Sequence, residues 1–278
     1  MKEGWSIYNY AFLPTTAPHE EAEVDVLLEG KVWSEGKAFM ARYTTDFDCG
    51  YETEWWYCIK DDPIDISKLK KKRRYEITRA LKNIDVKIIN PMNYKDEIFN
   101  NTMECFDEYP KQYKPNINYN TFSGEIKMWS QSAICFGAFL KNSGEFLGYA
   151  ICFLRKEYVS LAHLKVPSKY HSLGTNAALV YAVCTEFLNS NKYNIKYVSD
   201  GARNIRHKTN FQTYLEKYFG FRKAYCKLNI VYRPFFKYAI NLLYPFRNLI
   251  QLFGKQKHIY NLSCLLKQEE IHRSFKRN

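Results

Sequence analysis

Short apolar runs separated by polar turns dominate the middle of the chain. Three of them follow one another at 133–140, 145–154 and 158–166, and each has the length of a strand buried in a sheet. The first two are joined at 141–144 by Lys-Asn-Ser-Gly, a sequence typical of a β-hairpin turn. The pattern therefore predicts three consecutive antiparallel strands.

A longer segment at 174–190 is apolar nearly all round, which indicates a helix buried against a sheet. A further strand is predicted at 195–199. A helix that crosses between two strands of one sheet makes them parallel, so we expect 195–199 to lie parallel to 158–166. A helix and a last strand complete the series, at 211–219 and 221–232.

The chain before these strands is more polar. It predicts a strongly basic helix at 67–83, a short strand at 86–89, and helices at 94–109 and 122–131. From Val86 onward the order is β–α–α–β–β–β–α–β–α–β. This order predicts a mixed α/β sheet that is mostly antiparallel, with flanking helices.

The first 60 residues carry weaker patterns. We expect irregular structure at 1–30, and a hairpin or two neighbouring strands within 37–60. The predicted domain organisation is N-terminal strands and the basic helix at 1–85, packed on a main domain at 86–232. A basic amphipathic helical tail follows at 233–278.

The formal net charge of +12 is unevenly placed. Six of the seven residues from Lys68 to Arg74 are basic, and 233–278 holds nine Lys and Arg against two Glu. Such blocks favour phosphate-bearing partners, nucleic acid or an anionic membrane face, with a solvated surface as the plain alternative. The amphipathic part of the tail, 233–253, can lie on a membrane surface or pack back on the domain with its aromatic face buried.

The eight cysteines are scattered, with no CxxC pair and no Cys–His spacing typical of zinc. We therefore expect reduced thiols and no metal site. The N-terminus lacks the apolar core of a signal peptide, and no apolar run approaches the ~20 residues of a membrane-spanning helix. These features predict a cytoplasmic protein, peripheral to the inner face of the membrane if 233–253 lies on it.

The stretch 158–179 is the main candidate for chemistry. It predicts a strand, a break at Pro167, a polar loop with the single glycine Gly174, and the start of a helix. The first turn of a helix offers free backbone N–H groups and the positive end of its dipole, which suits a phosphate. The junction is either a phosphate site or an ordinary turn.

Three segments in this order resemble the GNAT superfamily of N-acyltransferases. They are LKVPSKYHSLGTNAAL at 164–179, IKYVSDGARN at 195–204 and FQTYLEKYFGFRKAYCKLNIVY at 211–232. The basic helix at 67–83, followed by VKIIN, is also similar to the Fem-type (FemAB) aminoacyl transferases, a branch of this superfamily. The resemblance implies that the main domain 86–232 is GNAT-like.

The resemblance implies a thioester donor, acetyl-CoA or another acyl-CoA. Its pyrophosphate would rest on the N–H groups of Leu173 to Asn176, and its pantetheine arm would pair with a strand edge that 195–199 leaves free by splaying away. A backbone N–H near Val166 would stabilise the oxyanion. The implied donor-binding residues are Leu164, Val166, Lys169, His171, Leu173, Gly174, Thr175 and Asn176.

An amine would attack the thioester directly, and a carboxylate or histidine would take its proton. Asp200 and His207 are the candidate bases, and Tyr214 is the candidate acid for the departing thiolate. Each has a plainer interpretation: Asp200 opens an Asp-Gly turn, His207 lies on a surface loop, and Tyr214 packs its helix.

The first functional hypothesis is a transfer of an acyl group from acyl-CoA to an amine, with an amino sugar or a cell-wall precursor as acceptor. The Fem-type likeness gives an alternative, an aminoacyl transferase that uses aminoacyl-tRNA. The basic helix at 67–83 would then contact tRNA phosphates. A third hypothesis is a non-catalytic module of the same fold that binds membrane or RNA.

Overall fold

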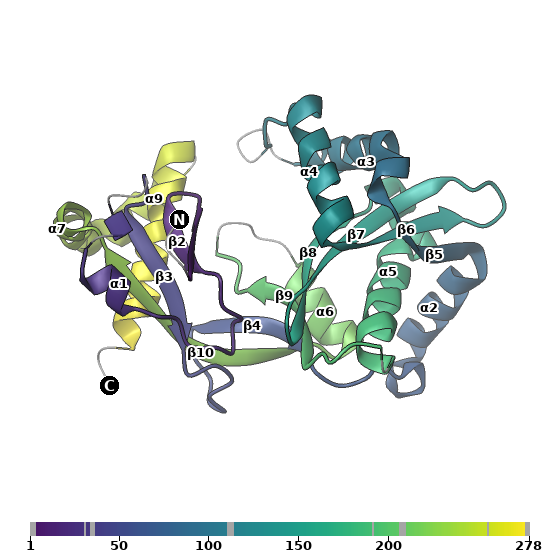
Figure 1. The fold of residues 1–278 in the computed structure, drawn as a ribbon, viewed down its shortest axis with the longest axis horizontal. Helices are drawn as coiled ribbons and strands as arrows, with labels where there is room; N and C mark the ends of the chain where they lie inside the picture. The colour runs from purple at the N-terminus through teal and green to yellow at the C-terminus, as the bar shows by residue number, and fades with distance from the viewer. Residues whose placement is uncertain are drawn as a thin grey trace. The chain divides into compact units, whose positions relative to one another are not determined.

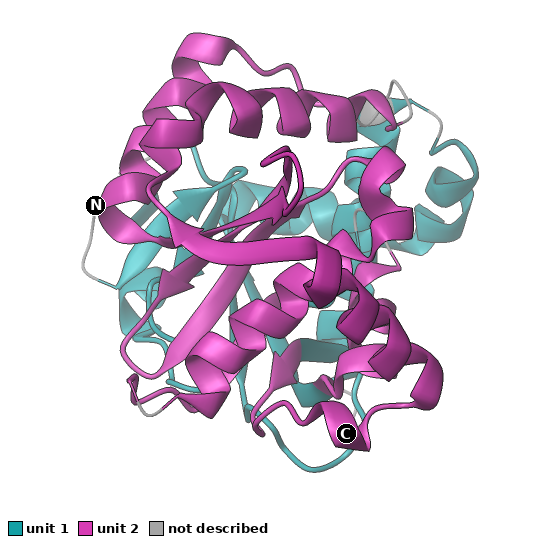
Figure 2. Ribbon diagram, turned by 90° about the vertical axis from the view of Figure 1, so that its right-hand side faces the viewer, with its two compact units in different colours: residues 1–57, 202–209, 223–278 teal, residues 58–201, 210–222 magenta. Residues whose placement is uncertain are grey.

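The computed structural model describes residues 4–30, 32–33, 37–109, 114–190, 192–205, 210–254 and 256–275. The chain forms two compact units, each assembled from separate stretches (Figure 2). Unit 1 holds 1–57, 202–209 and 223–278, and unit 2 holds 58–201 and 210–222. The boundaries of these units do not coincide with the predicted ranges 1–85, 86–232 and 233–278. The domain organisation given by those ranges stays a prediction.

The described strands form a ten-stranded, mostly antiparallel sheet, and strand β4 (Trp55–Lys60) contributes to both units. Within unit 2 the order is β4-β9-β8-β7-β6-β5. Strands β5 to β8 pair antiparallel in succession, and β9 pairs parallel with β8. The predicted meander and the parallel crossover strand are therefore confirmed. The bounds are β5 (Ile84–Ile89), β6 (Ile134–Leu140), β7 (Phe146–Leu154), β8 (Tyr158–Lys165) and β9 (Tyr197–Ala202).

Helices cover both faces of the unit 2 sheet, α3 and α4 on one side and α2 and α5 on the other (Figure 1). Ile98 and Ile126, from α3 and α4, are buried with Tyr149 of β7 in one hydrophobic cluster. Helix α5 has seven buried residues, which agrees with its apolar character on nearly all sides. The bounds are α2 (Lys71–Asn83), α3 (Lys95–Asp107), α4 (Tyr119–Ser132), α5 (Thr175–Cys184) and α6 (Phe211–Phe219).

Two predictions for the part of the chain in unit 1 are wrong. Residues 1–30 are not irregular, because β1 (Trp5–Tyr8) and β2 (Ala11–Pro14) form an antiparallel hairpin. Its two turn residues, Asn9 and Tyr10, both take positive φ (47° and 64°), the backbone of a type I′ turn without the usual glycine. The expected pairing within 37–60 is also wrong.

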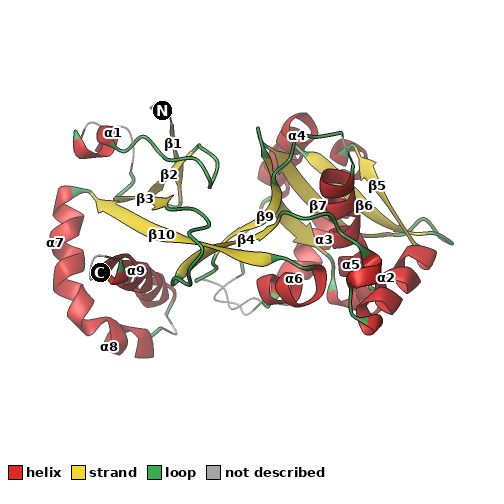
Figure 3. Ribbon diagram, turned by 90° about the horizontal axis from the view of Figure 1, so that it is seen from below, coloured by secondary structure: helices red, strands yellow, loops and turns green. Residues whose placement is uncertain are grey.

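The order in unit 1 is β1-β2-β3-β10-β4, so β10 (Arg222–Tyr232) lies between β3 (Met40–Thr45) and β4. A strand from far along the chain thus displaces the local partner. Helices complete the unit (Figure 3), and the carbonyl oxygen of Leu228 on β10 lies 3.0 Å from Nδ1 of His272 on α9. The bounds are α1 (Asp25–Leu28), α7 (Pro234–Leu243), α8 (Arg247–Leu252) and α9 (Lys257–Ser274). Among the described residues, no helix has the length and apolar character needed to cross a bilayer.

Candidate active site

The parallel strands β8 and β9 separate soon after they meet. Their pairing consists of three residue pairs and ends at Ser160 opposite Ser199. Beyond this point the β8 segment 161–165 continues along β7 without a β9 partner. An unpartnered strand edge presents backbone N–H and C=O groups that can pair with another extended chain. This is the splayed arrangement that the resemblance implied for the donor site.

A β-bulge lies at the same place. The register between β7 and β8 shifts so that Leu161 faces Cys152 and His163 faces Ile151, which leaves Ala162 as the extra, exposed residue. Bulges bend the strand and redirect its backbone groups, and they recur next to active sites. The edge of β8 is therefore distorted directly beyond its last contact with β9.

Asp200 follows Ser199, the last β9 residue paired with β8. Its carboxyl is partly buried, and this burial raises its pKa to about 7, opposed by a hydrogen bond from Gln212 of α6. A group with a pKa near neutrality exchanges protons readily at physiological pH. The next residue, Gly201, has φ 92°, in the left-handed region that favours glycine, and its N–H donates to Ser199 Oγ over 3.0 Å. Asp200 and Gly201 therefore lie within β9 and not in the turn that the dipeptide suggested, and the role of Asp200 as a base stays a prediction.

The loop after β8 is a 3₁₀ turn (Ser168–Leu173) that ends at Gly174 and leads into α5. Gly174 has φ 81°, and a Cβ added there would lie 3.0 Å from Ala80 Cβ of α2. Glycine is therefore required both by the backbone conformation and by the approach of α2. This packing was not predicted from the sequence. Thr175 is fully buried and its hydroxyl donates to Tyr170 O over 3.0 Å.

Two loop side chains have partners inside unit 2. Lys169 Nζ lies 2.7 Å from Glu104 of α3, an exposed ion pair of the kind that contributes about 0–1 kcal/mol. Nε2 of His171 lies 3.0 Å from the Val166 carbonyl oxygen. His171 thus links the loop to the end of β8, while Lys169 carries a charge already balanced by a carboxylate. Leu164, Leu173 and Asn176 are partly buried.

The Val166 N–H, predicted as an oxyanion donor, lies near Cys105 of α3. Burial raises the pKa of the Cys105 thiol to about 11, against the lowering effects of Lys165 and the Val166 N–H. Backbone N–H groups on the unpartnered edge of 161–165 are further candidate donors beside Val166.

Tyr214 is not brought together with Asp200. Residues two apart in a helix point in nearly opposite directions, so Tyr214 faces away from the side of α6 on which Gln212 reaches Asp200. Its hydroxyl lies 3.5 Å from Arg73 Nη1 of α2, and burial raises its pKa well above the ordinary range. Arg73 is buried, pairs with Glu76 at 2.6 Å and stacks over Tyr218 at 3.9 Å. His207 lies outside the described residues.

A polar pair, His163 and Lys165, lies on β8; the sequence pattern placed His163 in the core or on a sheet face and gave Lys165 no role. Burial, assisted by the charge of Lys165, lowers the pKa of His163 to about 4, so the imidazole is neutral at pH 7. Burial also lowers the pKa of Lys165, whose Nζ lies 4.4 Å from the Phe106 ring centroid and 5.7 Å from that of Tyr109. The alternation of polar residues in the strand was the available signal, but it did not show which face α3 covers.

A pocket of about 330 Å³ lies beside the loop, between the end of α2 and the β6–β7 turn. It contains three cations, yet two of them already bind carbonyl oxygens. Arg79 donates to Ser172 O over 2.6 Å, and Lys141 donates to Leu81 O of α2 over 2.7 Å. The last carbonyls of a helix carry partial negative charge, so Lys141 stabilises the end of α2, while Arg79 ties α2 to the loop after β8. The lining residues are Arg79, Lys82, Asn83, Leu140, Lys141, Asn142, Ser172 and Leu173.

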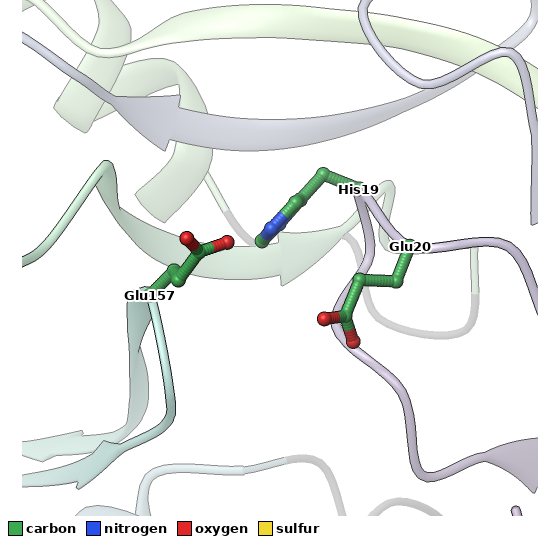
Figure 4. A group of neighbouring side chains, drawn as sticks. All are labelled: His19, Glu20 and Glu157. Atoms are coloured by element: carbon green, nitrogen blue, oxygen red, sulfur yellow. The ribbon is translucent and has the colours of Figure 1, made fainter.

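Neither unit by itself gathers three described His, Cys, Asp or Glu side chains at metal-binding distance. Figure 4 draws His19 and Glu20, which belong to unit 1, with Glu157, which belongs to unit 2. These three side chains are therefore not assigned as a metal site.

The meander, the crossover helix α5 and the parting of β8 from β9 define a GNAT-like fold. No protein-family model matches the sequence, and no curated protein matches it. Among solved structures, the crystal structure of FemX superimposes with a TM-score of 0.52 at 10% identity, over 77% of this chain and 78% of that chain. This similarity confirms the predicted Fem-type likeness at the level of the fold.

Two further solved structures match with lower TM-scores. L-PGS from Bacillus licheniformis gives 0.45 at 10% identity, over 71% of this chain and 64% of that chain. A tandem GNAT protein from the clavulanic acid biosynthesis pathway gives 0.44 at 10% identity, over 80% of this chain and 75% of that chain.

Proposed function

We propose that the protein is a transferase that moves an acyl group from a thioester to an amine where β8 and β9 part. The observation that carries this proposal is the position and chemistry of Asp200. It follows the last residue of β9 that pairs with β8, and burial raises its pKa to about 7. A carboxyl that is half ionised at neutral pH can take a proton from an ammonium group and return it.

The proposed donor is acyl-CoA, with its pantetheine arm extended along the unpartnered β8 edge at 161–165. Its pyrophosphate would meet the first N–H groups of α5 after Gly174, where the helix dipole favours an anion. His171 and Lys169 border this loop. Because α2 packs on Gly174, the phosphates would have to approach from the side of the loop away from Ala80.

In the proposed reaction the amine nitrogen attacks the thioester carbonyl and forms a tetrahedral intermediate. The Asp200 carboxylate takes the proton of the attacking nitrogen. The carbon–sulfur bond then breaks, and the thiolate leaves with the proton that Asp200 returns. A backbone N–H near Val166, on the unpartnered edge of β8, would hold the oxyanion. The proposed acceptor is an amino sugar or another amine of a cell-wall precursor.

Aminoacyl-tRNA is the second candidate donor, favoured by the fold shared with FemX and by the exposed basic face of α2. Lys70, Lys71, Lys72 and Arg74 are all exposed. Neutralising phosphates with such side chains gives binding that weakens steeply with salt. Retention of labelled tRNA by the protein, lost between low and high salt, would favour this donor over acyl-CoA.

The test of the proposal uses purified protein, acetyl-CoA and a panel of primary amines, with release of free thiol as the readout. Asp200→Asn should reduce the amine-dependent rate by at least about 100-fold, in the range expected for losing a general base. Asp85→Asn, a change at an exposed residue of β5, is the matched control and should leave the rate unchanged. Equal rates for Asp200→Asn and the wild type would refute the role of Asp200. Failure of acetyl-CoA to bind the wild type in calorimetry would refute the acyl-CoA donor.

A further inference from the structure

The outward side of the segment from α7 to α8 is apolar, which is the reverse of a normal solvent-facing helix. Seven large apolar side chains in this segment are each between 54% and 77% exposed. Scattered exposed hydrophobics are common, but a concentration of this kind in 19 residues marks an interaction surface. We call it the α7–α8 apolar face: Phe235, Tyr238, Leu242, Phe246, Leu249, Leu252 and Phe253.

The inner side of the same segment is firmly attached to unit 1. Ile240 and Tyr244 are buried, and the Phe236 ring packs against Phe39 with 5.2 Å between centroids. Figure 3 shows α7 and α8 following one another around α9. Because these inner contacts fix the orientation of both helices, the apolar face cannot turn inward without breaking them. The predicted alternative, with the aromatic face buried against the domain, is therefore disfavoured.

Polar bonds to α9 hold this orientation. Arg273 of α9 donates to Asn241 Oδ1 over 2.6 Å, and Arg247 Nε donates to Glu270 Oε1 over 3.1 Å. Arg273 also pairs with Glu269 at 2.6 Å. These polar bonds, together with the buried Ile240 and Tyr244, attach the segment to unit 1 and leave the α7–α8 apolar face outside.

The charge around the apolar face selects the kind of partner. No Asp or Glu occurs from Arg233 to Gln268, and the two that follow, Glu269 and Glu270, are paired with arginines of the same unit. Arg233 and Lys237 are exposed within the segment itself. An apolar face whose own segment carries basic and no acidic side chains complements an anionic lipid surface, whereas a second copy of the same segment would bring like charges together.

We propose that the α7–α8 apolar face docks the protein on the interfacial region of a membrane that contains anionic lipid. Phenylalanine, tyrosine and leucine would enter the boundary between headgroups and acyl chains, with both helices lying in the membrane plane. Arg233 and Lys237 would meet the headgroup phosphates. This proposal goes beyond the transferase function and does not depend on it, because docking requires no substrate.

The test is flotation of the full chain with vesicles of phosphatidylcholine, with or without phosphatidylglycerol. The wild type should float with the anionic vesicles and much less with the neutral ones. The variant Phe235→Ser/Leu242→Ser/Leu252→Ser should bind the anionic vesicles at least about 100-fold more weakly, since each lost side chain removes substantial apolar area. It should keep its unfolding temperature, because all three side chains are exposed.

A matched control carries the same number of serine changes at exposed apolar positions of unit 2: Ile88→Ser/Met128→Ser/Leu154→Ser. This control should float like the wild type. The proposal would be overturned if the wild type floated with neither vesicle type, or if the α7–α8 serine variant floated with anionic vesicles as well as the wild type does. A wild-type dimer in sedimentation without lipid that becomes monomeric in the α7–α8 variant would overturn it in favour of a second copy.

Discussion

Replacing Asp200 by asparagine should stabilise the protein at neutral and alkaline pH while it removes the proposed base. Burial raises the pKa of this carboxyl from 3.8 to about 7 in the folded chain. The folded state therefore holds the proton more tightly than the unfolded state. Between these two pKa values the unfolded state binds fewer protons, so the free energy of unfolding of the wild type falls as pH rises. Asparagine is neutral at every pH and avoids this loss.

The size of the effect follows from the shift. Each pKa unit corresponds to about 1.4 kcal/mol, so the full shift of Asp200 amounts to about 4 kcal/mol. Asp200 as a residue is only partly buried, and solvent screening reduces the expected gain to roughly 2–4 kcal/mol above pH 7. Well below pH 3.8 the wild type is protonated in both states, and the pH-dependent difference between wild type and variant should vanish.

Urea unfolding of wild type and Asp200→Asn at intervals from pH 4 to pH 8 measures this difference. The advantage of the variant should grow with pH and level off above pH 7, and Asp85→Asn should show no such growth. A pH-independent difference, or a wild type more stable than Asp200→Asn at pH 8, would refute the argument that burial disfavours the ionised carboxyl. Such behaviour would also remove the main support for Asp200 as a base.

Three further predictions concern the surroundings of the site. Gly174→Ala should lower the free energy of unfolding, measured in urea, by about 2 kcal/mol, because it strains a left-handed backbone and crowds α2. The control Gly144→Ala, at φ 74° with open space around it, should lower it by only about 1 kcal/mol. Equal losses in the two variants would contradict the packing argument. Arg73→Met should lower the free energy of unfolding by about 3 kcal/mol, since it leaves the partly buried Glu76 carboxylate without its cation. In the same assay, the double variant Arg73→Met/Glu76→Gln should recover part of this loss. Tyr214→Phe should keep the transfer rate within about threefold, because its hydroxyl faces α2; a loss of about 100-fold would restore its predicted role as the general acid.

Local sequence patterns were sufficient for most of unit 2. The runs at 133–140, 145–154 and 158–166 form β6, β7 and β8, because each apolar run ends at a strong turn signal. The helix predicted at 211–219 is present as α6 with the same bounds. The parallel placement of β9 followed from the crossover rule, which applies to the connection whatever the residues are.

Non-local pairing limited the prediction of unit 1. Strand β10 separates β3 from β4 in the sheet. The local pattern in 37–60 cannot show that β3 and β4 pair with this distant strand and not with each other. The turn between β1 and β2 was missed because Asn9 and Tyr10 adopt positive φ where glycine is the usual signal.

The site shows the same limit. Asp-Gly at 200–201 predicted a turn, but the pKa of Asp200 depends on burial beside α6, which the dipeptide does not encode. The packing of α2 on Gly174 and of Tyr214 on Arg73 likewise joins segments about a hundred residues or more apart. In the tail, periodicity predicted amphipathic helices, whereas only the contacts of α7 and α8 with α9 show that the apolar side faces outward.

The most direct test of the proposed function is the pH dependence of amine-dependent thiol release from acetyl-CoA. The proposal predicts that kcat/KM of the wild type rises with pH through a group with a pKa of about 7, as Asp200 ionises. In Asp200→Asn this step should disappear together with most of the rate, while acetyl-CoA still binds in calorimetry. An unchanged profile in Asp200→Asn would contradict the proposal that Asp200 is the base.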